Sequence, residues 1–225
     1  MEQLIEKNIR LILDTIIKVV TNPVGFFKDM PKSGGFIEPL VFMVSMGVVA
    51  GIIQAVFGII GLTYAASFVT ALTSIIIVPI AIAIFGFVSA GILFIIWKIM
   101  GSQESFETAY RCGAYTGAIV PITMVVGSIP YLGTIIGLAW TTYLFVIASI
   151  EVHKLNPKVS WIVFGAIGLL FSLISISSQY TARSITTQMG SFGGKMENMK
   201  DMTPEEAGRA MGEFLKGIDK GAKEE

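Results

Sequence analysis

Side chains able to do acid–base, nucleophilic or metal chemistry are scarce in this sequence. It contains one histidine, His153, and one cysteine, Cys112. A histidine that acts as a general base needs a nucleophile or metal within reach, and its sequence neighbours Glu151 and Lys154 supply neither. We therefore expect His153 to be a solvated loop residue. A lone cysteine excludes an internal disulfide and a cysteine-built zinc site, so we expect Cys112 to pack as a small apolar residue.

The remaining chemical motifs are also missing or incomplete. The sequence has no His-Glu-x-x-His, no Gly-x-Ser-x-Gly and no phosphate-binding Gly-x-x-x-x-Gly-Lys-Ser/Thr. The run 193–195, Gly-Gly-Lys, lacks the hydroxyl that should follow it. Glu107 and Arg111 stand four residues apart, which predicts an ion pair on one helix face. We expect no catalytic residue, no metal and no cofactor, and hence no enzyme.

The composition indicates a membrane protein. Of the 225 residues, 53% are hydrophobic and 14% are charged, against about 25% charged in soluble domains. From residue 39 to residue 178 only seven residues are formally charged, and they form two short clusters. A hydrocarbon layer about 30 Å thick needs such long apolar runs, whereas a soluble core does not. The zero net charge gives no indication of nucleic-acid binding.

The apolar runs predict a bundle of five transmembrane helices, at 40–62, 75–97, 109–128, 131–150 and 161–178. The charge-free run 65–97 is too long for one span, so we expect 64–74 to be a short surface helix or a steep extension. Pro79 and Pro121 fall inside the second and third spans. Tryptophan and tyrosine residues near the predicted ends fit the interfacial belt.

Two segments flank the predicted membrane domain of residues 39–178. We expect residues 1–38 to form a cytoplasmic segment. Within it, isoleucines and valines at three- and four-residue spacing over 3–21 predict an amphipathic helix. That helix either lies in the membrane interface or packs on the cytoplasmic ends of the spans. Residues 179–225 carry 15 charges. They predict a flexible tail that contains a linker at 190–194 and an amphipathic helix at about 204–220.

The distribution of basic residues predicts the orientation. Nine lysines and arginines occur in the N-terminal segment and in the loops that follow the second and fourth spans, and none in the other two loops. Because cytoplasmic loops are enriched in Lys and Arg, we expect a cytoplasmic N-terminus. Five spans then place the C-terminus outside, whereas six spans, the alternative, would place it inside.

Small residues recur at four-residue spacing in three predicted spans: Gly47 with Gly51, Gly113 with Gly117, and Gly133 with Gly137. Such pairs allow close helix contact in lipid. They predict either packing within one chain or self-association.

Several short motifs resemble the YIP (Ypt-interacting protein) domain family. They are the run 22–30 (Asn-Pro-Val-Gly-Phe-Phe-Lys-Asp-Met), Gly34-Gly35, the run 38–40, and the run 101–106 followed by Tyr110-Arg111, Tyr115 and Pro121. The resemblance covers about residues 15–178 and implies five spans with a cytosolic N-terminus. Eukaryotic relatives bind prenylated GTPases, and they carry a long cytosolic N-terminal region before the first span. The short region here is similar to prokaryotic members, whose role is generally unassigned. This resemblance implies the inner membrane, and GTPase binding is not carried over.

These observations favour a non-enzymatic scaffold or partner-binding membrane protein, in contact with lipid and with other membrane proteins. The candidate interaction or motif positions are Pro23, Phe26, Phe27, Gly101, Phe106, Tyr110, Arg111, Tyr115 and Pro121. Of these, we expect Phe26 and Phe27 to anchor a partner, the alternative being that they only seat the N-terminal helix. The rival function is a small-solute transporter or channel subunit that uses the prolines and Gln54. A membrane-shaping protein is the third class.

Overall fold

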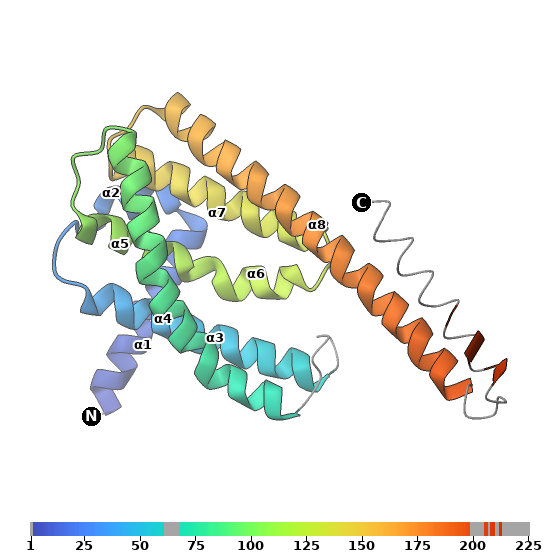
Figure 1. The fold of residues 1–225 in the computed structure, drawn as a ribbon. Helices are drawn as coiled ribbons and strands as arrows, with labels where there is room; N and C mark the ends of the chain where they lie inside the picture. The colour runs from blue at the N-terminus through green and yellow to red at the C-terminus, as the bar shows by residue number, and fades with distance from the viewer. Residues whose placement is uncertain (1, 61–67, 199–204, 207, 210–211, 213–225) are drawn as a thin grey trace. The chain divides into compact units, whose positions relative to one another are not determined.

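The structure, a computed structural model, describes residues 2–60, 68–198, 205, 206, 208, 209 and 212, and every regular element in these ranges is a helix (Figure 1). The elements are α1 (Glu2–Thr21), α2 (Pro23–Asp29), α3 (Ile37–Ile59), α4 (Phe68–Ile99), α5 (Phe106–Thr116), the 3-10 helix η1 (Gly117–Ile119), α6 (Val120–Gly127), α7 (Leu132–Glu151) and α8 (Pro157–Asn198). The chain divides into two compact units, Met1–Ile174 and Ser175–Glu225, and the contacts below are those of the first.

Four helices are long and apolar enough to cross a bilayer: Ile37–Ile59, Leu72–Ile99, Leu132–Glu151 and Pro157–Ile185. The outer face of α4 is a continuous apolar surface, with Ile76, Ile80, Ile84 and Phe85 each more than half exposed. Soluble monomers rarely expose so large an apolar face, because water solvates it poorly. The prediction of an all-α protein with several membrane helices is thus confirmed.

Two predicted boundaries differ from the structure. Residues 68–74 form no separate element, because α4 already begins at Phe68 and continues past Pro79. Residues 61–67 lie outside the described residues. The fifth span was expected to end at 178, but α8 continues to Asn198, through the predicted linker at 190–194. The predicted end at 178 was placed where the hydropathy of the sequence falls. The helix continues beyond that point, and no proline after Pro157 interrupts it. The helix expected at about 204–220 lies largely outside the described residues.

The third predicted span, 109–128, is a broken helix and is not among the four long ones. It consists of α5, η1 and α6 in succession. Pro121 has no amide proton, and its ring conflicts with the carbonyl four residues earlier, at Gly117. The backbone therefore tightens to a 3-10 turn over Gly117–Ile119 before α6 resumes.

Three connecting segments meet at one end of the bundle, and we call them together the loop face: residues 30–36, 100–105 and 152–156. A salt bridge joins Lys32 Nζ to Glu104 Oε1 at 2.6 Å, and Ser102 Oγ lies 2.7 Å from His153 Nδ1. The C-terminal ends of α4 and α7 are therefore at the same end of the bundle, beside α2 and α5 (Figure 1).

Helix α1 packs on this end of the bundle. Val19 is fully buried, and Ile12, Ile16 and Val20 pack against the same core. Asn22 ends the helix and caps α2, since its Oδ1 accepts from Gly25 N at 3.0 Å, while Pro23 occupies the first turn of α2 and needs no amide partner there. The predicted stripe is only partly inward, because Ile9 is 52% exposed.

Glycines allow α3 and α4 to approach closely. A Cβ added at Gly51 would lie 2.8 Å from the Ser74 carbonyl oxygen, and one at Gly47 would lie 2.8 Å from Pro79 Cα. Ser74 Oγ also donates to the Gly51 carbonyl at 3.1 Å. This glycine pair therefore serves packing within the chain and is not available for self-association.

We predict that Gly51→Ala destabilises the protein, because the new methyl group meets α4 backbone that has no flexible end to move. Overpacking of this kind costs about 1–3 kcal/mol. The matched control is Gly91→Ala, on α4, whose added Cβ would meet nothing within 4 Å. Thermal unfolding in detergent, followed by circular dichroism, should give a lower midpoint for Gly51→Ala than for the control. Equal midpoints would contradict the close α3–α4 contact.

Candidate functional site

The segment 32–38 is joined to α5 by a set of polar contacts. Gly35 takes part twice: its N–H donates to Glu107 Oε1 at 2.7 Å, and its carbonyl accepts from Arg111 Nη1 at 3.1 Å. Arg111 Nη2 also donates to Glu38 Oε2 at 2.9 Å, and Thr108 Oγ1 donates to the Lys32 carbonyl at 3.1 Å. We call these contacts the clamp. They hold the N-terminal segment and the beginning of α3 against α5.

The guanidinium of Arg111 is the centre of the clamp. Its side chain is 1% exposed, whereas that of its partner Glu38 is 69% exposed. The charge is offset by the Glu38 carboxylate, the Gly35 carbonyl and the ring of Tyr115, whose centroid lies 5.9 Å from Arg111 Cζ. Arg111 Nε has no hydrogen-bond partner among the described residues. A buried charge is tolerated only when it is paired in this way.

The backbone at Gly34–Gly35 explains why glycine occupies these positions. Their φ angles are +133° and +85°, in the region that side chains with a Cβ rarely adopt. This conformation directs both the N–H and the carbonyl of Gly35 toward α5. The predicted ion pair between Glu107 and Arg111 is therefore wrong: each bonds to the segment 35–38 instead, because that segment lies over their helix face.

A buried polar cluster joins the ends of α4 and α7. The indole of Trp97 stacks on His153 with centroids 4.0 Å apart, and Trp97 Nε1 donates to Ser149 Oγ at 2.7 Å. Ser102 Oγ accepts from Glu104 N at 3.2 Å and forms a hydrogen bond with His153 Nδ1 at 2.7 Å. The other ring nitrogen, Nε2, lies 3.9 Å from Cys112 Sγ.

The prediction that His153 is solvated is wrong, because it is 4% exposed. Burial lowers its pKa from 6.5 to about 4, since the imidazolium would lose its hydration. The Ser102–His153 contact has the length of a nucleophile–base pair. However, the serine is also buried, no carboxylate of the described residues bonds to the ring, and a base with a pKa near 4 is weak at neutral pH. The pair therefore acts as a structural link between two loops.

Cys112 is fully buried in the core cluster, as expected for a small packing residue. It is a free thiol, and its neighbour His153 offers only a ring nitrogen 3.9 Å away. Among the described residues no group of three or more His, Cys, Asp or Glu side chains could hold a metal ion.

Most of the predicted interaction positions lie in the core behind the loop face. Phe27 is 1% exposed, and Phe26 packs edge-on against both Phe27 and Tyr115, with centroids 5.4 and 5.3 Å apart. A buried Phe27 does not fit the expectation that it anchors a partner; it seats α2 in the core. Tyr110 stacks on Phe87 at 4.3 Å and is likewise buried.

The other predicted positions shape the backbone or fill gaps. Pro23 begins α2 and is buried, and Pro121 lies in the first turn of α6. Gly101 has φ +101°, which closes the turn after α4. Phe106 packs against Phe94 with centroids 5.8 Å apart.

Sequence reasoning did not identify Trp97, Ser102 and Ser149 as members of one cluster. A tryptophan at the end of a span is typical of the membrane interface, and that rule concealed the buried role of Trp97. Glu38 and Gly35 were singled out only as part of a family-like motif. The available signal was a run of two glycines before a helix together with a single arginine in an apolar helix.

We predict that Arg111→Met releases the segment 32–38. The loss of charged hydrogen bonds worth about 1.5–3 kcal/mol should speed hydrogen exchange of the Gly35 amide by about 10- to 100-fold. Hydrogen exchange with mass spectrometry on the protein in detergent measures this rate. Lys158→Met, an exposed lysine at the start of α8, is the matched control and should leave exchange unchanged. Equal protection in the two variants would show that the clamp does not hold the segment.

The lowered pKa of His153 predicts a pH dependence of stability. Between pH 6.5 and about 4 the unfolded chain binds the proton that the folded chain excludes, so the free energy of unfolding falls as pH falls through this window. The loss amounts to about 3 kcal/mol at most. Because the chain has one histidine, its ring signal in NMR reports the folded pKa directly. His153→Phe, which keeps the stack, should remove the dependence in this window; a folded pKa near 6.5 would contradict the burial.

Comparison with known proteins supports the motif resemblance. No curated protein and no solved structure matches the chain. The family model of the Yip1 domain matches residues 17–178. This range begins within α1, includes the clamp and the buried cluster of Trp97 and His153, and ends within α8. The match covers well over half of the sequence, and with the apolar helices described above it shows that the chain is a multi-span membrane protein that belongs to the Yip1 domain family.

Proposed function

We propose that this chain is a non-enzymatic scaffold of the cytoplasmic membrane, with five membrane crossings, a cytoplasmic loop face that binds partners, and its C-terminus outside. The observation that carries the proposal is the set of hydrogen bonds formed by the polar side chains at and behind the loop face. Arg111 and Glu107 bond to the segment 35–38, Trp97 bonds to Ser149 of α7, and His153 bonds to Ser102. None of the four lines a cavity described for this part of the chain. Such a network makes a rigid surface, which suits binding.

The direction of the long helices supports five crossings. The ends of α4 and α7 are joined by the contacts Trp97–Ser149 and Ser102–His153, so both helices run toward the loop face. The chain leaves α4 at that face and must enter α7 from the opposite one. The segment 106–127 between them therefore has to cross. Its 22 residues would cover about 33 Å as a continuous helix, which is sufficient for the hydrocarbon layer.

The charges support a cytoplasmic loop face. Lys28, Lys32, Lys98, Lys154 and Lys158 all lie in or beside its segments, and cytoplasmic loops are the ones enriched in such residues. Helix α1 exposes apolar side chains every four residues along one strip: Ile9, Leu13 and Ile17. A strip of this kind suits a helix that lies in the membrane interface while its other side packs on the bundle.

A transporter or channel subunit is the second candidate, because a cavity of about 350 Å³ lies between α4, α7 and α8. Its lining is apolar apart from hydroxyl groups such as those of Ser89, Thr141 and Thr142. Gln54, the polar residue expected to serve a pathway, lies on an exposed part of α3 and does not line this cavity. Solute flux in proteoliposomes that is lost on Thr142→Val would favour this function over the scaffold.

The topology can be tested with single cysteines in a Cys112→Ala background. Membrane-impermeant reagents should label Gln103→Cys and Asn156→Cys only from the cytoplasmic side, and Ser128→Cys only from outside. Gly91→Cys, within α4, is the lipid-buried control and should stay unlabelled. If Gln103→Cys and Ser128→Cys react from the same side, segment 106–127 does not cross and the five-crossing proposal fails.

A photo-crosslinking amino acid tests the partner-binding role. Placed at the exposed positions Gln103 or Lys154 of the loop face, or at Lys28 beside it, it should give a discrete adduct with another membrane protein in native membranes. Placed at Phe85, on the outer face of α4, it should give lipid adducts only. Lipid adducts alone at all four positions would remove the support for a scaffold.

A further inference from the structure

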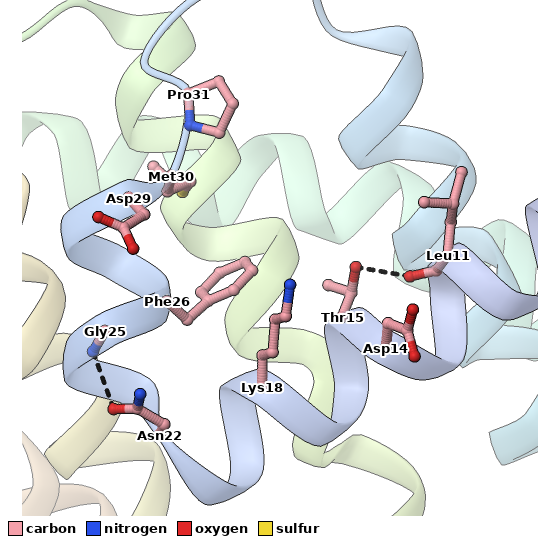
Figure 2. A pocket seen from close by; sticks show the side chains of 10 residues that line it. All are labelled: Leu11, Asp14, Thr15, Lys18, Asn22, Gly25, Phe26, Asp29, Met30 and Pro31. Atoms are coloured by element: carbon pink, nitrogen blue, oxygen red, sulfur yellow. Dashed lines mark hydrogen bonds between the residues drawn. The ribbon is translucent and has the colours of Figure 1, made fainter.

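A cavity between α1 and α2 carries three charged side chains that form no ion pair within the described part of the chain. The cavity has a volume of about 350 Å³, and Figure 2 shows Lys18 extending into the angle between the two helices. Asp14 lies on the α1 side and Asp29 on the α2 side. Asp14 and Lys18 are four residues apart, in the order that favours a helix ion pair, yet neither forms one here.

The cavity combines these charges with an apolar floor. Phe26 of α2 and Met30, the residue that follows this helix, line it, and Met30 is 5% exposed. Figure 2 shows Lys18 between Asp14 and Asp29, which lie on opposite sides of the cavity. Lys18 and Asp14, four residues apart on α1, complement a ligand that carries an anion and a cation close together. A phosphate would pair with Lys18, and a primary ammonium would donate to Asp14.

A second cavity adjoins this site. It has a volume of about 280 Å³ and shares the lining residues Leu11 and Thr15 with the first. Its other lining residues include Val41, Phe42 and Glu38 of α3, and Val41 is 53% exposed on the outer face of that helix. An apolar chain that leaves the charged cavity past Leu11 would reach Val41 and Phe42.

We propose that the α1–α2 cavity binds the headgroup of a phosphatidylethanolamine-type phospholipid. Lys18 holds the phosphate, Asp14 holds the primary ammonium, and one acyl chain follows the second cavity to α3. The shared chemistry, an ammonium next to a phosphate, also occurs in soluble phosphoethanolamine compounds; the acyl route past Leu11 and Val41 assigns the lipid as the source. This inference rests on the proposed position of α1 in the membrane interface.

The test uses the full chain in nanodiscs of equal phosphatidylethanolamine and phosphatidylcholine with the same acyl chains. After gentle detergent extraction, native mass spectrometry counts the lipids that remain bound. We expect the ethanolamine lipid to be enriched about tenfold, because three methyl groups on the choline nitrogen remove its hydrogen-bond donors. Equal retention of the two lipids, or enrichment of an added anionic phosphatidylglycerol, would overturn the proposal without any variant.

Matched variants locate the site. Asp14→Asn should abolish the preference between the two lipids, and Lys18→Gln should reduce the retention of both. The controls Glu6→Gln and Lys28→Gln change the same charges on the same helices outside the cavity, and should leave both readouts unchanged. Near-UV circular dichroism confirms that each variant is folded. A preference that survives Asp14→Asn would place the lipid elsewhere.

Two further arms separate the sources of failure. Soluble glycerophosphoethanolamine should not displace the lipid at millimolar concentration; displacement would assign a soluble ligand to the cavity and overturn the lipid proposal. A spin label at Leu13→Cys reports the depth of α1 in the bilayer. A label in water would refute the interfacial position itself, whereas a label at headgroup depth without lipid preference would refute only the lipid site.

Discussion

The burial of one guanidinium determines how the N-terminal part of this protein is placed. Arg111 cannot lose its charge, and in the core it is stable only with acceptors that replace water. α5 itself supplies none of the charged acceptors, so the chain brings Glu38 and the Gly35 carbonyl to it. The position of 32–38 then sets where α3 begins and where α2 docks. The Glu107 contact with Gly35 N completes the arrangement by satisfying the other backbone group of the same residue.

The aromatic core behind the loop face depends on this placement. With α2 docked, Phe26, Phe27 and Tyr115 form an edge-to-face group, a geometry that stabilises aromatic pairs beyond their buried area. Trp97 and His153 form the corresponding contact between α4 and α7. Here the histidine acts as a flat, uncharged ring with two polar nitrogens. It bonds to Ser102 through one nitrogen and stacks on Trp97. Both groups position loops, and neither brings reactive atoms to an open surface.

The sequence was sufficient for the class of protein and the order of its helices, because apolar runs of 20 or more residues have few alternatives. It failed where tertiary contacts override local patterns. Glu107 and Arg111 have the spacing of a helix pair, but Gly35, which precedes them by 72 and 76 residues, bonds to both of them. His153 stands beside charged neighbours in a polar loop, yet it turns inward onto Trp97. Hydropathy also misplaced the end of the last helix, because it measures affinity for lipid and not the tendency to remain helical.

The proposed third crossing has a consequence for biogenesis. α5 contains Glu107 and Arg111 and is only 11 residues long, and α6 has eight residues. Neither is apolar and long enough to partition into a bilayer by itself. In the proposed topology, the segment 106–127 would therefore cross only once Gly35 and Glu38 are in place to pair with Arg111. The orientation of α7 and α8 would then depend on an assembly step between helices already inserted, and not on the hydropathy of the segment that precedes them.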